Sequence, residues 1–177
     1  MNKQKAALAA LSSLFLFLPT TFVESATITG NIAVSLTVNS TCLVNNVSSG
    51  TFGTLAFGPV ADLNSNVDAE VSSSGLSVLC SSGTAATLDI GAGSNDSGSV
   101  RHLTNGAGTP TLISYRLYSN SARSTEIAIG GTINVSAGTG VAQTVPIYGR
   151  IVASEQTLKY PPAGNYTDTI TATLTWN

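Results

Sequence analysis

The chain has 177 residues, of which 42% are hydrophobic and only 9% are charged, and its formal net charge at pH 7 is −2. A typical soluble domain carries about 25% charged residues. Such a weakly acidic chain lacks the basic footprint of a nucleic-acid-binding protein, so no nucleic-acid partner is expected.

Residues 1–25 have the features of a secretion signal. Lys3 and Lys5 precede an uncharged apolar run, Ala6 to Leu18, and a polar exit follows. The 13 residues of this run fall short of the roughly 20 that a spanning helix needs, which argues against a signal anchor. We expect cleavage before Ala26. Removing 25 of 177 residues leaves 152, the size of one domain, with a formal charge of −3 because two lysines and one glutamate are lost.

The stretch from Thr27 to Val38 alternates between apolar and polar residues, which is the pattern of a strand with one face toward a core. One face carries mainly Thr, Ser and Asn. The apolar face consists of Ile28, Gly30, Ile32, Val34, Leu36 and Val38. Such a strand needs a sheet to complete, and the pattern leaves open whether that sheet belongs to its own chain or to a neighbouring molecule.

The chain contains two cysteines, Cys42 and Cys80, both in the secreted part. In an oxidising compartment an even pair in a domain of this size is most simply one disulfide. The alternative is a metal-binding pair. One histidine in the whole chain leaves a four-ligand zinc site incomplete, so we expect no metal.

Almost every other apolar run is short and is bounded by Gly, Asn, Ser or Pro, which is typical of an antiparallel sandwich. We expect strands or strand-like segments, in chain order, at 51–58, 71–80, 86–90, 112–118, a short hairpin at 127–135 turning at Gly130 and Gly131, 145–152 and 166–176, with a loop at 91–110.

The last expected strand is as regular as the first. Threonines at every second position alternate with an inward set: Tyr166, Asp168, Ile170, Ala172, Leu174 and Trp176. The chain stops at Asn177, so nothing follows to supply a further strand to this sheet. Two interpretations remain open, a sheet that is complete as it stands and a sheet that lacks its final strand.

Catalytic patterns are absent from the sequence. The single histidine, His102, lies beside Arg101 with no strand-to-helix elbow for a nucleophile, and the acidic residues are scattered. The glycine-rich stretch at 91–99 lacks the acidic spacing of a calcium loop. We therefore expect no enzyme and no cofactor.

Four motifs occur together in the secreted part: F-G-T-L-A-F-G at 52–58, I-S-Y-R-L-Y-S-N at 113–120, V-P-I-Y-G-R-I at 145–151 and A-G-N-Y-T-D-T-I-T-A-T-L-T-W at 163–176. Their order, their spacing and the two cysteines resemble the spore coat protein U domain family, which includes the Csu-type pilins of archaic chaperone-usher pili. The resemblance runs from about Ala26 to Trp176.

This resemblance implies an all-β fold, an incomplete immunoglobulin-like antiparallel β-sandwich completed by a donor strand from another molecule. It implies transit through a bacterial periplasm with a dedicated chaperone and export through an outer-membrane usher. It also implies a disulfide between Cys42 and Cys80. The implied donor strand carries Ile28, Gly30, Ile32, Val34 and Leu36, and the implied edge of the open groove carries Tyr166, Ile170, Ala172, Leu174 and Trp176.

The expected organisation is a signal peptide at 1–25, a donor segment at 26–38 and a pilin domain at 39–177, with Val38 shared with the first strand of its own domain. The expected function is that of a shaft or adaptor subunit that joins identical or different neighbours head-to-tail into an adhesive surface fibre for attachment and biofilm formation. Two alternatives are a self-complete secreted sandwich that binds a ligand through its loops, and a structural protein of a spore coat or envelope.

Overall fold

The computed structural model describes residues 24, 26–72, 75–106, 108 and 110–177. The expected signal peptide therefore lies, except for Glu24, outside the described residues. The chain divides into two units, Met1–Thr37 and Val38–Asn177, and the second unit holds all of the described strands.

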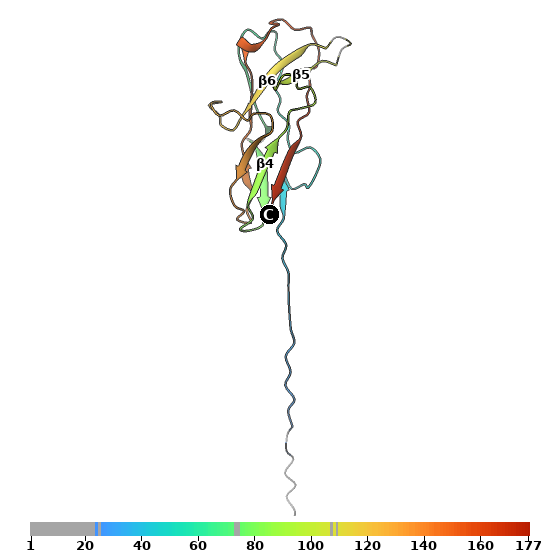
Figure 1. The fold of residues 1–177 in the computed structure, drawn as a ribbon, viewed down its shortest axis with the longest axis vertical. Helices are drawn as coiled ribbons and strands as arrows, with labels where there is room; N and C mark the ends of the chain where they lie inside the picture. The colour runs from blue at the N-terminus through green and yellow to red at the C-terminus, as the bar shows by residue number, and fades with distance from the viewer. Residues whose placement is uncertain (1–23, 25, 73–74, 107, 109) are drawn as a thin grey trace, which may run out of the picture. The chain divides into compact units, whose positions relative to one another are not determined.

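The described strands of the second unit form antiparallel sheets, and η2 (Ala153–Glu155) is a short 3-10 turn (Figure 1). All strand ladders among the described residues are antiparallel, which confirms the expected fold class. The strand order of the first sheet is β1 (Cys42–Val44), β3 (Leu76–Cys80), β8 (Gln143–Val145). The strand order of the second sheet is β10 (Ala172–Trp176), β4 (Ala86–Ile90), β7 (Gly131–Val135). The strand order of the third sheet is β2 (Val67–Glu70), β9 (Tyr148–Ile151), β6 (Leu112–Tyr118), β5 (Arg101–Thr104).

The period-two pattern of the sequence accounts for the core. In β3 and β4 every second side chain is buried and the intervening ones are partly exposed. Leu88 at the centre of β4 is completely buried, and Val78 of β3 is 1% exposed. These strands bury one face because the alternating apolar side chains form a single cluster with those of β6, β8 and β9.

A proline and a glycine lie at two points where the chain passes from one sheet to another. The expected strand at 145–152 is two strands, because Pro146 has no N–H to donate and separates β8 from β9. The expected hairpin at 127–135 is wrong in its pairing. The chain does turn at Gly130, whose φ is +69°, but Ile127 bonds to Leu117 of β6 whereas β7 pairs with β4. The turn therefore connects two sheets.

Several expected elements differ from the structure in extent. Strand β10 covers only residues 172–176 of the expected strand at 166–176, and β3 covers only residues 76–80 of the expected strand at 71–80. The expected loop at 91–110 contains a strand, β5, which pairs with β6. Its sequence, R-H-L-T, lacks the apolar alternation that marks the other strands, and so the pattern missed it. The expected strand at 51–58 is not formed. This segment has an isolated bridge, between Leu55 and Val71, and no continuous ladder.

The N-terminal segment also differs from the expectation. The described residues from 26 to 41 are assigned to no strand, and β1 begins at Cys42. Val38 is 79% exposed and lies outside β1, although it falls within the second unit, so its expected sharing with the first strand of its own domain stays a prediction. The alternating pattern specifies a face, but a strand ladder also needs a partner for its backbone groups.

A buried arginine links three segments within the domain. Arg101 of β5 is 3% exposed. Its guanidinium donates hydrogen bonds to the backbone carbonyls of Ile90, Gly91, Ile127 and Ala128 at 2.7 to 3.2 Å. The charge is buried among carbonyl dipoles at the end of β4 and in the 127–128 segment. Two of these carbonyls, those of Ile90 and Ala128, also accept the N–H groups of Gly130 and Gly131.

Candidate functional site

The apolar face of the N-terminal segment is exposed to solvent. The side chains of Ile28, Ile32, Val34, Leu36 and Val38 are between 79% and 99% exposed. Gly30, between them on the same face, has no atom within 4 Å of the position that a Cβ would occupy. A contiguous row of this kind is unfavourable in water and marks a surface that binds another polypeptide or a membrane.

The last strand presents a second apolar row, which is only half covered. Thr167, Thr169, Thr171, Thr173 and Thr175 are exposed, whereas the residues between them face inward. Four of these pack against the core and are partly buried: Tyr166, Ile170, Ala172 and Leu174. The fifth expected member, Trp176, is 41% exposed at the end of β10. We call Tyr166, Ile170, Ala172, Leu174 and Trp176 the acceptor row.

The backbone of the acceptor row lies at the edge of a sheet. β10 pairs with β4 on one side, as Figure 1 shows, and within the described part of the chain no strand is hydrogen-bonded to its other side. The same ladder continues upstream, because Gly91 and Ser94 donate their N–H groups to the carbonyls of Thr171 and Thr169. Backbone groups alternate sides along a strand, so the N–H and C=O groups of Ile170 and Leu174 point to the free edge.

A third set of half-buried apolar side chains, which sequence reasoning did not single out as site residues, comes from the 51–58 segment. Phe52, Leu55 and Phe57 pack against the same core without being fully covered. Leu55 and Phe57 are two apart in the sequence, and this spacing was the signal available. The core of the domain therefore remains incompletely covered both along the last strand and along this segment.

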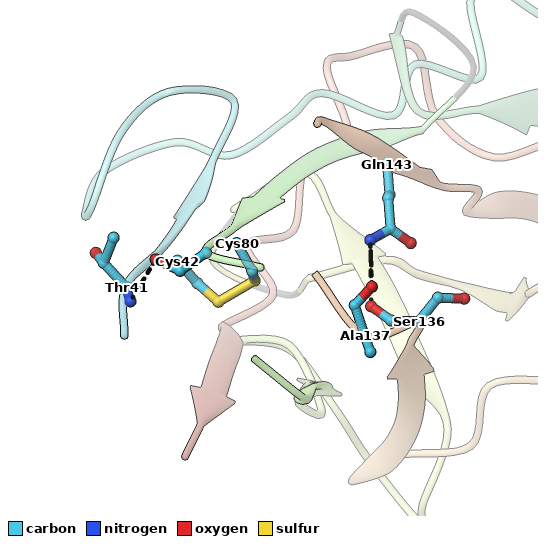
Figure 2. The surroundings of a disulfide bond; sticks show 7 residues. Thr41, Cys42, Cys80, Ser136, Ala137 and Gln143 are labelled. Atoms are coloured by element: carbon cyan, nitrogen blue, oxygen red, sulfur yellow. Dashed lines mark hydrogen bonds between the residues drawn. A yellow bond between two sulfur atoms is a disulfide. The ribbon is translucent and has the colours of Figure 1, made fainter. Parts of the chain in front are cut away.

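The expected disulfide is confirmed. Cys42 of β1 and Cys80 of β3 are a register pair, and their sulfur atoms are bonded (Figure 2). Both cysteines are at most 3% exposed. Thr41 donates its N–H to the side chain of Ser81, just beyond the bridge. The disulfide thus anchors the first strand to β3, the central strand of the first sheet.

The residues considered for catalysis are not brought together. His102 lies on β5, opposite Ser114 of β6, and its Nδ1 atom is buried without a hydrogen-bond partner. Within the described ranges there is no group of three or more His, Cys, Asp and Glu side chains that could hold a metal ion. A search of those same residues finds no helix of the length and apolarity needed to cross a membrane.

Comparison with known proteins adds two findings at the level of sequence. Residues 28–173 match the model of the Spore Coat Protein U domain. The chain is also similar to Protein U of Myxococcus xanthus, with 33% identity over 192 aligned positions that cover 99% of this chain and all of that protein.

The fold is similar to that of a chain in the crystal structure of the CsuC–CsuE chaperone–tip adhesion subunit pre-assembly complex, from the archaic chaperone-usher Csu pili of Acinetobacter baumannii. The TM-score is 0.50 at 20% sequence identity, and the match covers 78% of this chain. This chain spans about 40% of the length of that one. The likeness supports the expected immunoglobulin-like pilin fold and extends to the fold alone.

Proposed function

Since the chain belongs to the Spore Coat Protein U domain family, we propose that it is a subunit of a surface fibre that polymerises by donor-strand exchange. The family is one of structural proteins, so the protein is a structural subunit and not an enzyme. In the proposed arrangement, residues 26–38 of one molecule form the donor strand, and the acceptor row on residues 166–176 of the next molecule receives it.

One observation carries this proposal: the chain has an exposed alternating apolar segment and, separately, an edge strand whose inward side chains are half covered. The two features are complementary, because the exposed segment has no sheet and, among the described residues, no strand is hydrogen-bonded to the free side of the edge strand. A strand added beside β10 would form backbone hydrogen bonds with it and would cover the core. Burying Ile28, Ile32, Val34 and Leu36 contributes roughly 1.5 to 3 kcal/mol each before ordering costs.

The contact is head-to-tail, because the donor segment and the acceptor row are different surfaces of one chain. A contact of this kind does not close on itself and produces a fibre. Before assembly, the half-covered edge would promote aggregation, which explains the need for a periplasmic chaperone that lends a strand. The similar solved structure is a pre-assembly complex of a chaperone with a tip adhesion subunit, which supports a chaperone as a partner. Export through an outer-membrane usher, and use of the fibre in attachment and biofilm formation, complete the proposal.

The localisation follows from the same proposal. Residues 1–25 direct secretion into the periplasm, residues 26–38 are the donor segment and residues 39–177 are the pilin domain, whose first strand starts at Cys42. A second candidate is a structural protein of a spore coat or envelope, which the description of the family and the full-length similarity to Protein U favour. Donor-strand exchange is compatible with either setting.

Deletion of residues 26–36 from the secreted chain tests the proposal. We expect the deleted protein to stay soluble and folded only when a chaperone or an added peptide of residues 26–38 is present. The matched control is the same peptide with Ile32→Asp, which keeps the length and the polar face but should not rescue. A deleted chain that is secreted as a folded monomer without help would contradict the proposal and support a self-complete binding module.

A further inference from the structure

One residue interrupts the apolar character of the last strand. Asp168 lies between Tyr166 and Ile170 on the inward face, and it is partly buried, whereas its neighbours Thr167 and Thr169 are exposed. A carboxylate on an inward face is costly unless hydrogen bonds replace its water. The position of Asp168 therefore calls for a physical account.

The carboxylate of Asp168 is fully bonded within its own domain. The Tyr115 hydroxyl donates to Oδ2 at 2.6 Å. Oδ1 accepts from the N–H groups of Ser94 and Asn95 at 2.9 and 3.2 Å and from the side-chain amide of Asn95 at 3.0 Å. Gly93, with φ +94°, lets the loop close over the carboxylate, since a Cβ there would lie 2.2 Å from Oδ2.

Tyr115 connects the two half-covered rows. Its side chain is 4% exposed on β6, and its ring meets that of Phe57 edge-on with centroids 6.0 Å apart. Burial, followed by the hydrogen bond to Asp168, raises the pKa of the Tyr115 hydroxyl, which therefore stays protonated and donates. Phe57 belongs to the 51–58 segment and Asp168 to the last strand, so the two rows meet at Tyr115.

On the C-terminal side of Asp168 the inward positions are all apolar: Ile170, Ala172, Leu174 and Trp176. These are four positions, whereas the donor segment offers six on its apolar face. A slip of one residue would turn the apolar face outward and is excluded. A slip of two residues keeps the faces in phase, so the alternating pattern alone does not define which donor residue lies opposite which acceptor residue.

We propose that the Tyr115–Asp168 pair is the end stop that sets the register of the incoming donor strand. This inference rests on the proposed function and adds to it a positioning role for two residues that the donor strand does not need for its apolar contacts. An apolar donor side chain slipped beyond Ile170 would lie against a carboxylate whose hydrogen bonds all come from neutral groups. Covering it would remove the remaining water from a negative charge that has no ion pair among the described residues to replace it. The incoming strand is therefore held over Ile170 to Trp176.

Cysteine scanning measures the register directly. Ile170→Cys is combined in the full chain with a single cysteine at each apolar donor position in turn, and fibres are collected from the native host. Cross-linked peptides are then identified by mass spectrometry. We expect residue 170 to cross-link to one donor position in the wild-type background. In the Asp168→Leu, Tyr115→Phe background, we expect the partner to shift by two residues or to spread over two positions.

Two controls separate this role from a purely structural one. Asp168→Asn keeps a polar side chain beside Tyr115 and should keep the single wild-type partner. If the double variant is not secreted, Asp168→Ala is scanned in its place, with the same expected shift. An unchanged single partner in the Asp168→Leu, Tyr115→Phe background or in Asp168→Ala, or several partners in the wild type, would overturn the end stop alone. Fibres in which residue 170 cross-links to no donor position would overturn the proposed function as well.

Discussion

Asp68 of β2 and Arg150 of β9 are a register pair, and their side chains form a two-point ion pair with N to O distances of 2.6 and 2.8 Å. Arg123 approaches the same carboxylate at 3.3 Å. A second network on the same sheet joins Arg116 to Glu126 and Glu155. In a chain with few charges, these groups are concentrated on the β2–β9–β6 sheet, far in sequence from the apolar donor segment.

The pH dependence of the Asp68 pair can be predicted. The hydrogen bond from Arg150 lowers the pKa of Asp68, with the charge of Arg123 adding to it. A lowered folded-state pKa stabilises the fold at pH values above the ordinary 3.8, and this contribution is lost as the pH falls through the lower value. Because the Asp68 side chain is 41% exposed, we expect Asp68→Asn to cost less than about 1 kcal/mol at neutral pH and nothing at pH 2.

Guanidinium unfolding of the assembled chain at pH 7 and pH 2 checks this prediction, with a urea series to keep the ionic strength low. Glu70→Gln on the same strand is the charge-matched control and should have little effect at either pH. A loss for Asp68→Asn that persists at pH 2 would show that packing, and not the ion pair, accounts for it.

A charge in the donor segment should block assembly according to the face it occupies. Val34→Asp places a carboxylate on the apolar face, where burial without a partner costs several kcal/mol. We expect the yield of fibre to fall at least tenfold, while the chaperone-bound subunit still accumulates. Ser35→Asp, the next residue on the polar face, is the matched control and should assemble. Electron microscopy and gel analysis of sheared fibres measure both, and equal yields would refute the donor assignment.

Replacement of the buried arginine should destabilise the domain. Arg101→Met keeps much of the volume but removes the donors to four backbone carbonyls, for which we expect a loss of about 2 to 4 kcal/mol. Arg101→Lys should recover only part of it, because an ammonium group cannot reproduce the planar fork. The midpoint of guanidinium unfolding measures the loss. Arg116→Met, which removes the partly exposed ion pairs with Glu126 and Glu155, is the control and should cost about 1 kcal/mol or less.

Removal of the disulfide should have a comparable cost. Cys42 and Cys80 are 38 residues apart, and closing such a loop restricts the unfolded chain by about 4 kcal/mol in the loop-entropy model. We expect the double Cys42→Ser, Cys80→Ser variant to unfold at markedly lower guanidinium concentration and to be degraded during secretion. Wild-type stability under reducing conditions should match that of the double variant. A reduced wild type as stable as the oxidised one would contradict this expectation.

Tyr115 should make the fold sensitive to alkali. Burial raises the pKa of its hydroxyl above the ordinary 10.0, so its contribution to stability is fully present below pH 10 and is lost as the pH rises above it. We expect the unfolding midpoint of the wild type to fall between pH 10 and pH 11. The Tyr115→Phe variant should start from a lower midpoint and fall less over the same interval. Parallel slopes for the two proteins would exclude Tyr115 as the titrating group.

Much of the fold followed from the period of the apolar residues. Strands were predicted at 71–80 and 86–90, where β3 and β4 lie, since an alternating run indicates a strand with one buried face without reference to a partner. The strand β5 was not predicted, because Arg101 occupies its buried position and a charged residue gives no apolar signal. The pairing of β7 was also mispredicted, because a glycine turn indicates a change of direction but not the strand that receives the chain.

The sequence by itself determined the all-β class, the alternating N-terminal segment and the inward face of the last strand, and it indicated the disulfide. These properties depend on residue type and on neighbours along the chain. Only the tertiary structure decided that β1 begins at Cys42, that β10 has a free edge and that Tyr115 hydrogen-bonds Asp168. These relationships join segments tens of residues apart, and hydrogen bonds and packing across such distances depend on how the strands are ordered in space, which no local pattern encodes.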